Sequence, residues 1–144
     1  MALAKRMTKR EYHGFLRDRA RTAVVATVRA DGRPHAAPVW FDLDGDTIVF
    51  TTGHDTVKGR NMRRDPRVTL CIEDENPPFH FVIIEGIAEL TAEDPALLHW
   101  ATRIGGRYMG TKRADEYGQR NAVSTELLVR VTPQKILAHK NISD

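Results

Sequence analysis

The sequence predicts a mainly β protein with flanking helices. Three apolar runs rich in Val, Thr, Ile, Phe and Trp follow one another at residues 22–29, 34–43 and 46–52. An Asp-Gly pair separates each run from the next, and such a pair can adopt the positive φ of a tight hairpin. A short helical pattern then follows at residues 55–64. We therefore expect an antiparallel meander that leads into a helix.

The length and composition of the chain predict one domain. Its 144 residues are 41% hydrophobic and 28% charged, which is ordinary for a soluble globular protein. The chain has no apolar run near the roughly 20 residues of a membrane helix, and its basic N-terminus lacks the apolar segment of a secretory signal. We therefore expect residues 1–144 to form a single domain that is cytoplasmic and does not enter a membrane.

Charge, histidine and cysteine content argue against several classes of ligand. The net charge of +3 comes from basic residues spread among 19 acidic ones, and the basic segment at residues 58–67 lacks aromatic neighbours for base stacking. The six histidines stand too far apart for a local metal motif. Cys71 lies in the apolar run VTLCI and is expected to be buried rather than reactive. Neither nucleic acid nor a metal ion is expected as a partner.

A short N-terminal helix is expected to close one end of the sheet. Thr8 and Glu11 have the spacing of a capping box, and Tyr12, Phe15 and Leu16 follow at helical spacing. The basic residues among the first ten are interpreted as a solvated tail.

The second apolar run carries two prolines, Pro34 and Pro38. Two prolines in one strand favour an edge position or a bulge, which leaves backbone N–H and C=O groups free. The small side chains of Ala36 and Ala37 keep this strand low, so a flat ring system can lie against it. The alternative, that Pro38 protects an edge strand from aggregation, is equally compatible with the sequence.

Trp40 and Phe41 end this run and point to opposite faces of the strand. One of them therefore points inward, where core packing is the expected role. The alternative is that Trp40 lines a ring pocket.

The end of the third run combines features that suit a phosphate. Thr51 and Thr52 supply hydroxyl groups, Gly53 permits a turn, and the next helix carries Lys58 and Asn61 three residues apart on one face. We interpret these side chains as anchors of a cofactor phosphate. A solvated basic helix is the alternative.

The second half of the chain continues the alternation of strands and helices. A fourth strand is expected at residues 67–74 and a long fifth strand at 79–90, bending at Gly86. A helix should open at residues 91–95 with an acidic first turn and an early proline. Its expected buried stripe consists of Leu97, Leu98, Ala101 and Ile104.

The pair Gly105-Gly106 is expected to end or kink this helix. Residues 111–121 then read as a short exposed helix or ordered loop without chemistry. The last part of the chain predicts two strands, or one strand broken by Pro133, followed by a polar tail.

Several segments together resemble a known family. The run from DGRPHAAPVWF through the Thr-Thr strand end to the helix of Lys58 and the following Asp65-Pro66-Arg67-Val68 resembles the flavin- and deazaflavin-binding split β-barrel family related to pyridoxamine 5'-phosphate oxidase. Within that family it is most similar to the branch that uses coenzyme F-420, a deazaflavin. The resemblance implies a split β-barrel of the FMN-binding type.

The resemblance also implies a site and a partner. The ring of the cofactor is expected on the second strand, the phosphate at the start of the next helix, and a second copy of the chain across the site in a homodimer. By the resemblance, Arg107 and Tyr108 would approach the cofactor of the partner subunit. Independently of it, the acidic tail of F-420 requires a basic exit path, which Arg60, Arg63 and Arg64 would form. The expected cofactor-binding residues are Ala36, Ala37, Pro38, Val39, Trp40, Thr51, Thr52, Lys58, Arg60, Asn61, Arg107 and Tyr108.

The sequence lacks the motifs of other catalytic machinery, such as G-x-S-x-G, a Walker loop or a dinucleotide fingerprint. A flavin-type ring carries its own hydride chemistry, so no catalytic side chain is required. We expect an oxidoreductase that uses reduced F-420 to transfer a hydride to an unsaturated or quinone-like small organic acceptor. The alternatives are an FMN-dependent oxidoreductase like pyridoxamine-phosphate oxidase, a non-catalytic flavin or deazaflavin carrier and, least supported, a nucleic-acid or regulatory module.

Overall fold

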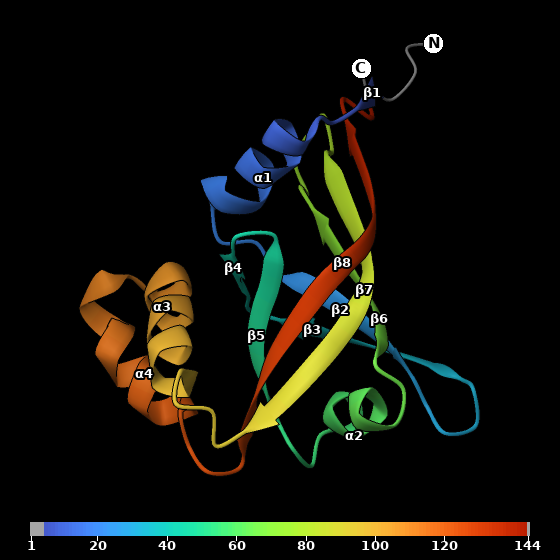
Figure 1. The fold of residues 1–144 in the computed structure, drawn as a ribbon. Coiled ribbons are helices and arrows are strands. Elements are labelled where there is room, and N and C mark those ends of the chain that lie inside the picture. The colour runs from blue at the N-terminus through green and yellow to red at the C-terminus, as the bar shows by residue number, and fades with distance from the viewer. Residues whose placement is uncertain (1–4, 144) are drawn as a thin grey trace.

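The computed structural model describes residues 5–143 as a strongly curved antiparallel sheet with helices at both ends and along one side (Figure 1). The strands are β1 (Lys5–Arg6), β2 (Ala23–Val28), β3 (Pro34–Val39), β4 (Asp42–Asp44), β5 (Thr47–Gly53), β6 (Arg67–Glu73), β7 (Phe81–Ala92) and β8 (Glu126–Lys140). The helices are α1 (Lys9–Asp18), α2 (Val57–Arg64), α3 (Leu97–Met109), the 3-10 turn η1 (Thr111–Arg113) and α4 (Ala114–Asn121). This confirms the predicted fold class.

The strand order is β3-β2-β6-β7-β8-β5-β4, and β1 pairs with β8. The predicted second strand, residues 34–43, is therefore two strands that lie at opposite ends of this order. Pairing breaks at Trp40 and Phe41 because the chain crosses there from one edge of the sheet to the other. This crossing brings the two edges together without closing the sheet, which is the geometry of a split barrel. Pro34 and Pro38 lie on an edge strand, as predicted.

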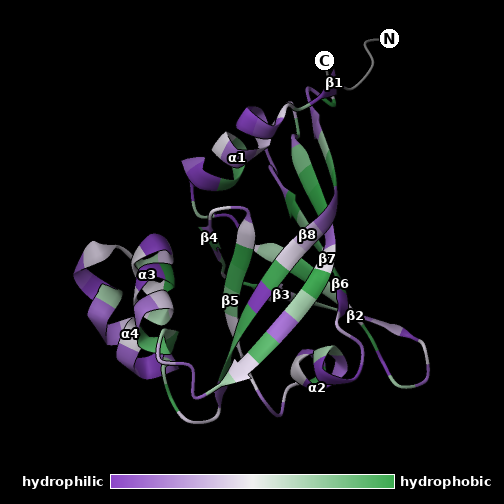
Figure 2. Cartoon of the chain, in the orientation of Figure 1, coloured by the Kyte–Doolittle hydropathy of each residue, from purple (hydrophilic) through white to green (hydrophobic). Residues whose placement is uncertain are grey.

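The core fills the inside of the curved sheet. Alternate residues of the strands point inward, among them Val25 of β2, Leu70 of β6 and Ile84 of β7, and Phe41 is fully buried among them. A second, smaller core lies outside the sheet, where Leu97 and Trp100 of α3 pack on Val49 and Leu128. Apolar residues are correspondingly concentrated on the strands, and the helices are hydrophilic outward (Figure 2).

Helix α1 lies across one end of the barrel, and its boundaries follow from local sequence signals. The capping box is formed, because the Thr8 hydroxyl accepts from the backbone of Glu11 and the Glu11 carboxylate accepts from the backbone of Thr8. Phe15 and Leu16 are buried beneath it. Lys5 and Arg6, expected in a solvated tail, instead pair with β8 as the short strand β1. Residues 1–4 of that tail lie outside the described part of the chain.

The α3–α4 hairpin differs from expectation in three respects. Helix α3 begins at Leu97 because β7 continues to Ala92 and the Asp94 side chain closes a turn on the backbone of Ala96 at 2.8 Å. Leu98 is 53% exposed, and Trp100 takes its expected place in the buried stripe.

The third difference concerns Gly105 and Gly106, which lie inside α3 rather than ending it. They are explained by close packing, since a Cβ on Gly105 would lie 2.6 Å from Cβ of Tyr117 on α4. The helix ends at Met109, before Gly110 with a φ of +94°. The two glycines are therefore explained by the close approach of α4, and they do not mark the end of the helix.

The long strands β7 and β8 run side by side and bend together. Their register shifts between Glu85 and Gly86, as the glycine predicted, and Gln134 is the extra residue on the opposite strand. The sequence left open whether Pro133 separates two strands or interrupts one, and the structure has one continuous strand with this bulge. A Cβ on Gly86 would lie 2.6 Å from the carbonyl oxygen of Thr132, so glycine is required for the two backbones to approach.

Replacement of this glycine tests the account of the bend. Gly86→Ala should lower the free energy of unfolding by about 1–3 kcal/mol, because backbone atoms of β8 must move to admit the methyl group. Gly14→Ala is the control, since Gly14 lies in α1 with no atom within 4 Å of the added Cβ and should gain about 0.5–1 kcal/mol. Urea unfolding followed by circular dichroism measures both. An unchanged midpoint for Gly86→Ala would refute the packing argument.

Candidate functional site

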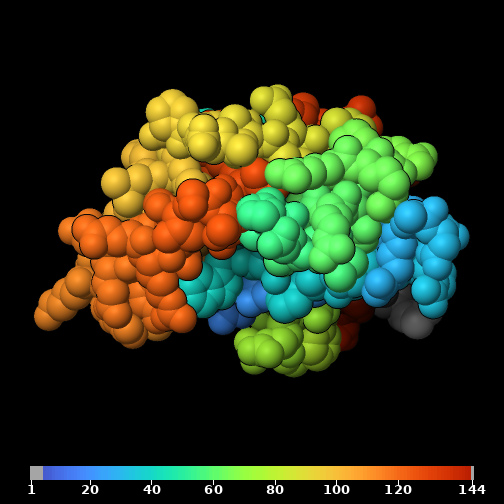
Figure 3. Space-filling model, turned by 90° about the horizontal axis from the view of Figure 1, so that it is seen from below, coloured from blue at the N-terminus to red at the C-terminus, as the bar shows by residue number. Residues whose placement is uncertain are grey.

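A cleft of about 490 Å³ opens between the strand ends of the barrel and the helices. It is lined by Thr22, Pro38, Val39, Trp40, Thr51, Lys58, Ile104, Asn121 and Glu126. Seen from below, cyan and teal strand residues lie between the orange α4 and the green α2 (Figure 3). The cleft therefore joins the predicted ring strand and the predicted phosphate helix.

One wall of the cleft is an aromatic stack. The indole of Trp40 lies parallel to the ring of Tyr108 on α3, with centroids 4.9 Å apart and 6° between the planes. Trp40 is 36% exposed and lines the cleft, whereas Phe41 points into the core. The structure therefore favours the interpretation of Trp40 as a lining residue.

Tyr108 holds the strand break in place. Its hydroxyl accepts from the backbone N–H of Phe41 at 3.2 Å and donates to the carbonyl of Arg21 at 2.6 Å. Burial raises the pKa of Tyr108 above its ordinary value, which keeps the hydroxyl protonated and able to donate. Tyr108 thereby joins α3 to the segments that directly precede β2 and β4.

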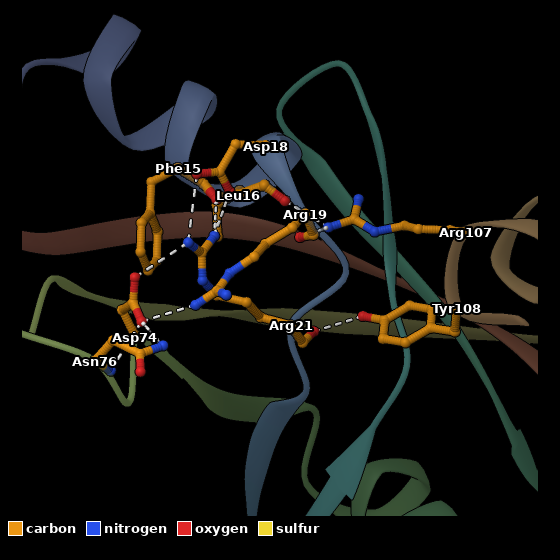
Figure 4. A network of polar contacts seen from close by, with 9 residues as sticks. All are labelled: Phe15, Leu16, Asp18, Arg19, Arg21, Asp74, Asn76, Arg107 and Tyr108. Carbon is orange, nitrogen blue, oxygen red and sulfur yellow. Dashed lines mark hydrogen bonds and ion pairs between the residues drawn. The ribbon is translucent and has the colours of Figure 1, made fainter. Parts of the chain in front are cut away.

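The backbone that Tyr108 contacts is itself anchored by a buried cation (Figure 4). The Arg21 guanidinium lies 4.0 Å from the centre of the Phe15 ring and is paired with Asp18 and Asp74. Arg21 is 9% exposed, so these partners replace water around its charge. The network ties α1 to β2 and to the turn after β6.

Arg107 extends the same framework. Its guanidinium donates to Asp42 at 3.4 Å. It also donates to the backbone carbonyls of Leu16 and Arg19 (Figure 4). Arg103 donates to the other oxygen of Asp42 at 3.1 Å. Within one subunit, Arg107 and Tyr108 therefore position α3 on the barrel, and contact with a cofactor held by the partner subunit stays a prediction.

At the other wall, a chain of hydroxyl groups joins the end of β5 to α2. The Thr56 hydroxyl caps α2 by accepting from the N–H of Gly59 at 3.1 Å and donates its proton to the carbonyl of Gly53 at 2.8 Å. Thr52, 3.0 Å away, must then be the donor to Thr56. Thr52 is 3% exposed and serves this cap, while its neighbour Thr51 lines the cleft.

The remaining expected phosphate residues lie elsewhere on α2. Asn61 is 3% exposed, and its amide donates to the Thr27 hydroxyl at 3.0 Å and accepts from Arg64. Arg60 donates twice to the carbonyl of Asp55. The side chains that we expected around one phosphate are therefore separated, because Lys58 lines the first cleft and Asn61 lines a different one.

The second cleft, of about 390 Å³, lies between α2 and the hairpin of β2 and β3. Its charged residues are Arg29, Asp31, Arg33, Arg60 and Arg64. Four guanidinium groups against one carboxylate make it strongly electropositive.

Two expected ring contacts lie along β3, away from the lining of the first cleft. Ala36 and Ala37 are opposite Ala26 and Val25 of β2. Ala36 is exposed and Ala37 is half-buried.

Sequence reasoning missed Thr22, Ile104, Asn121 and Glu126. These residues come from four separate segments and reach the cleft through tertiary packing, so no local motif marks them. Glu126 is the charged member of this group, and its Oε2 is buried without a hydrogen-bond partner among the described residues. Burial raises the pKa of Glu126, while the charges of Lys58 and His54 oppose that shift.

The described residues, 5–143, contain no group of three His, Cys, Asp or Glu side chains that could hold a metal ion. Likewise, none of the helices in this range is long and apolar enough to cross a membrane.

Comparison with protein families matches residues 8–140 to the family described as "Pyridoxamine 5'-phosphate oxidase". Among curated proteins, the chain is 37% identical over 109 residues to the pyridoxine/pyridoxamine 5'-phosphate oxidase of Myxococcus xanthus. That match covers 75% of this chain and 52% of the relative. The chain therefore spans about half the length of this relative.

Solved structures support the same fold. A conserved hypothetical protein from Mycobacterium tuberculosis superposes with a TM-score of 0.80 at 27% identity, covering 96% of this chain and 89% of the other. A structure named F420 reductase superposes with a TM-score of 0.68 at 26% identity, covering 85% of this chain and 94% of the other.

The hydroxyl of Tyr108 offers a test of how the cleft wall is held. Tyr108→Phe keeps the stack on Trp40 but leaves the N–H of Phe41 and the carbonyl of Arg21 without their partner. We expect a loss of about 1–3 kcal/mol in the free energy of unfolding. Tyr108→Leu, which also removes the ring, should lose more. Chemical denaturation measures both losses. An unchanged stability of Tyr108→Phe would show that the hydroxyl does not contribute, and equal losses in the two variants would show that the ring does not.

Proposed function

The chain belongs to the pyridoxamine 5'-phosphate oxidase family, and we propose that it is an oxidoreductase using reduced coenzyme F-420. The proposed substrate is an unsaturated or quinone-like small organic molecule that would accept a hydride. The observation that carries the proposal is the cleft that places Lys58, Thr51 and Trp40 together at the strand break.

The lining of the cleft has the chemistry that a phosphorylated ring cofactor requires. Lys58 supplies a positive charge and Thr51 a hydroxyl donor for a phosphate. Trp40 offers a partly exposed aromatic face, and Pro38 and Val39 an apolar strand surface, for a planar ring. The volume of about 490 Å³ is within the range of small-molecule sites.

When bound, the deazaflavin supplies the hydride chemistry, and the chain contributes binding and position. Lys58 neutralises phosphate charge and thereby fixes one end of the cofactor. Trp40, held by its stack on Tyr108, limits how far the ring can shift. Ile104 on α3 is a buried apolar lining residue and would exclude water from its part of the cleft.

The electropositive second cleft favours F-420 over FMN. F-420 continues beyond its phosphate into lactate and glutamates, whereas FMN ends at the phosphate. Arg60 and Arg64 lie on α2, the helix that also carries Lys58, and line the second cleft with Arg29 and Arg33. A chain of carboxylates leaving the phosphate would find complementary charge there. The likeness to the structure named F420 reductase points in the same direction.

An FMN-dependent oxidase is the second candidate, and the names of the curated relatives favour it. A carrier that binds the cofactor without turnover is the third. The chain matches about half of the Myxococcus xanthus relative, so activity and substrate do not transfer with the name.

We further propose a homodimer with the cofactor sites at its interface. Strand pairing aligns an outward-facing apolar row across the sheet that consists of Pro38, Val24, Cys71, Ile83 and Leu137. Cross-strand partners share a face, so these side chains form one surface, and Val24 in it is 42% exposed. Because the row begins at Pro38 in the cleft, a second copy that covers it would also reach the cofactor.

Cofactor titration tests the proposed function. The purified protein should bind F-420 more tightly than FMN, and reduced F-420 should be consumed when a quinone is added. Tighter binding of FMN would favour the oxidase candidate, and binding without turnover would favour the carrier.

The same titration tests the phosphate anchor. A charge-assisted hydrogen bond contributes about 1.5–3 kcal/mol, so Lys58→Ala should weaken F-420 binding by roughly tenfold to a hundredfold. Salt should weaken wild-type binding more than that of the variant, because the lost contact is ionic. Arg120→Ala on α4, whose guanidinium packs on Tyr117, is the control and should bind as wild type does. A Lys58→Ala protein of wild-type affinity would place the phosphate elsewhere.

Light scattering at micromolar concentration tests the dimer. The wild type should have twice the mass of one chain, and Val24→Lys should be monomeric with weaker cofactor binding, because a charge would be buried at the interface. Leu98→Lys is the matched control, since Leu98 is an exposed apolar residue on α3, outside this row. A wild-type monomer that binds cofactor fully would exclude an interface site.

A further inference from the structure

Glu126 introduces a negative charge where a phosphate is proposed to bind. It is the first residue of β8, pairs with Gly53 at the end of β5, and lines the same cleft as Thr51 and Lys58. One carboxylate oxygen is buried without a hydrogen-bond partner among residues 5–143. A buried carboxylate beside an anion site is costly, so its presence calls for a physical explanation.

The charged groups that act on Glu126 come from two segments. Lys58 lies on α2, and His54 lies in the turn between β5 and α2, where it also contacts Asp55 at 2.7 Å. Asn121 of α4 shares the cleft and is neutral. When Glu126 is ionised, it offsets the charge of Lys58, and the cleft retains little net positive charge.

The two candidate cofactors differ in the charge of their phosphate. F-420 carries a phosphodiester, which has one negative charge at all pH values near neutrality. FMN carries a phosphomonoester, which takes a second negative charge with a pKa of about 6. The carboxylate therefore repels the dianionic monoester more strongly than the diester, and this repulsion cancels the stronger attraction that Lys58 alone would exert on the dianion.

We propose that Glu126 is a specificity-determining residue that makes the cleft favour a phosphodiester over a phosphomonoester. This inference rests on the proposed function, because it assigns the phosphate to the cleft of Lys58. The carboxylate of Glu126 adds a repulsion that discriminates against the phosphomonoester of FMN. Attraction by Lys58 alone cannot provide this discrimination.

The central experiment measures the dissociation constants of F-420 and FMN for wild type and Glu126→Gln. The amide keeps the shape of the side chain and removes the charge. We expect FMN to bind about tenfold more tightly to the variant, while F-420 affinity changes less than about threefold, so that the selectivity ratio falls. Riboflavin, which lacks the phosphate, should bind both proteins equally.

Two further variants separate charge from structure. Glu126→Asp keeps the charge and should keep most of the selectivity. Glu89→Gln removes an exposed carboxylate on β7 and should leave both affinities unchanged. Thermal unfolding of each variant identifies any loss of fold, and Glu126→Asp together with the pH series then decides the question.

The pH series follows from the raised pKa of Glu126. A bound phosphate raises this pKa further, so F-420 binding takes up a proton and weakens as pH rises through the range in which Glu126 ionises. The part of the slope that disappears in Glu126→Gln belongs to Glu126.

The outcomes are distinguishable. An unchanged ratio of FMN to F-420 affinity in Glu126→Gln, or an unchanged pH slope, overturns the inference and leaves the proposed function intact. Failure of wild type to bind either cofactor overturns both.

Discussion

The break in strand pairing at Trp40 and Phe41 is the constraint on which the rest of the structure depends. Here the chain leaves one edge of the sheet and joins the other, so the backbone loses its ladder partners at a buried position. The Tyr108 hydroxyl accepts from the N–H of Phe41, which has no partner in the sheet, and donates its proton to the carbonyl of Arg21. Arg21 is in turn fixed by carboxylates and by the ring of Phe15. Helix α3 therefore supplies hydrogen bonds that hold the two edges of the sheet at the break, and it is an integral part of the barrel.

The same break creates the candidate site. Because Phe41 points into the core, Trp40 points outward and stacks on Tyr108, the residue that hydrogen-bonds the backbone at the break. The opposite wall is held by hydrogen bonds between hydroxyl groups, in which Thr52 contacts Thr56, the residue that caps α2. Structural and functional demands therefore meet in neighbouring residues: Phe41 and Thr52 serve the fold, while Trp40 and Thr51 line the cleft.

What could be predicted from the sequence was what local chemistry decides. The capping box at Thr8, the Asp-Gly turns and the bend at Gly86 depend on neighbours along the chain or on backbone freedom, and each is present. The glycine pair in α3 was misinterpreted, because its cause is Tyr117 on another helix. Glu126 was missed for the same reason, since only folding brings β8 beside α2. The expected phosphate set was divided because helical spacing does not reveal that Asn61 is held by Thr27.

Strand β8 has a consequence for how the protein is made. It lies between β7 and β5 in the sheet, yet it comes after every other strand along the chain. When residues up to 121 have left the ribosome, the nascent chain therefore has one group of strands, β3-β2-β6-β7, and a second group, β5-β4. Strand β8, which joins the two groups, has not yet been made available. Inner residues such as Val129 and Val131 complete the core only when this segment emerges from the ribosome. Pairings of such long sequence separation slow folding, and until then the facing edges of β5 and β7 are open to other chains.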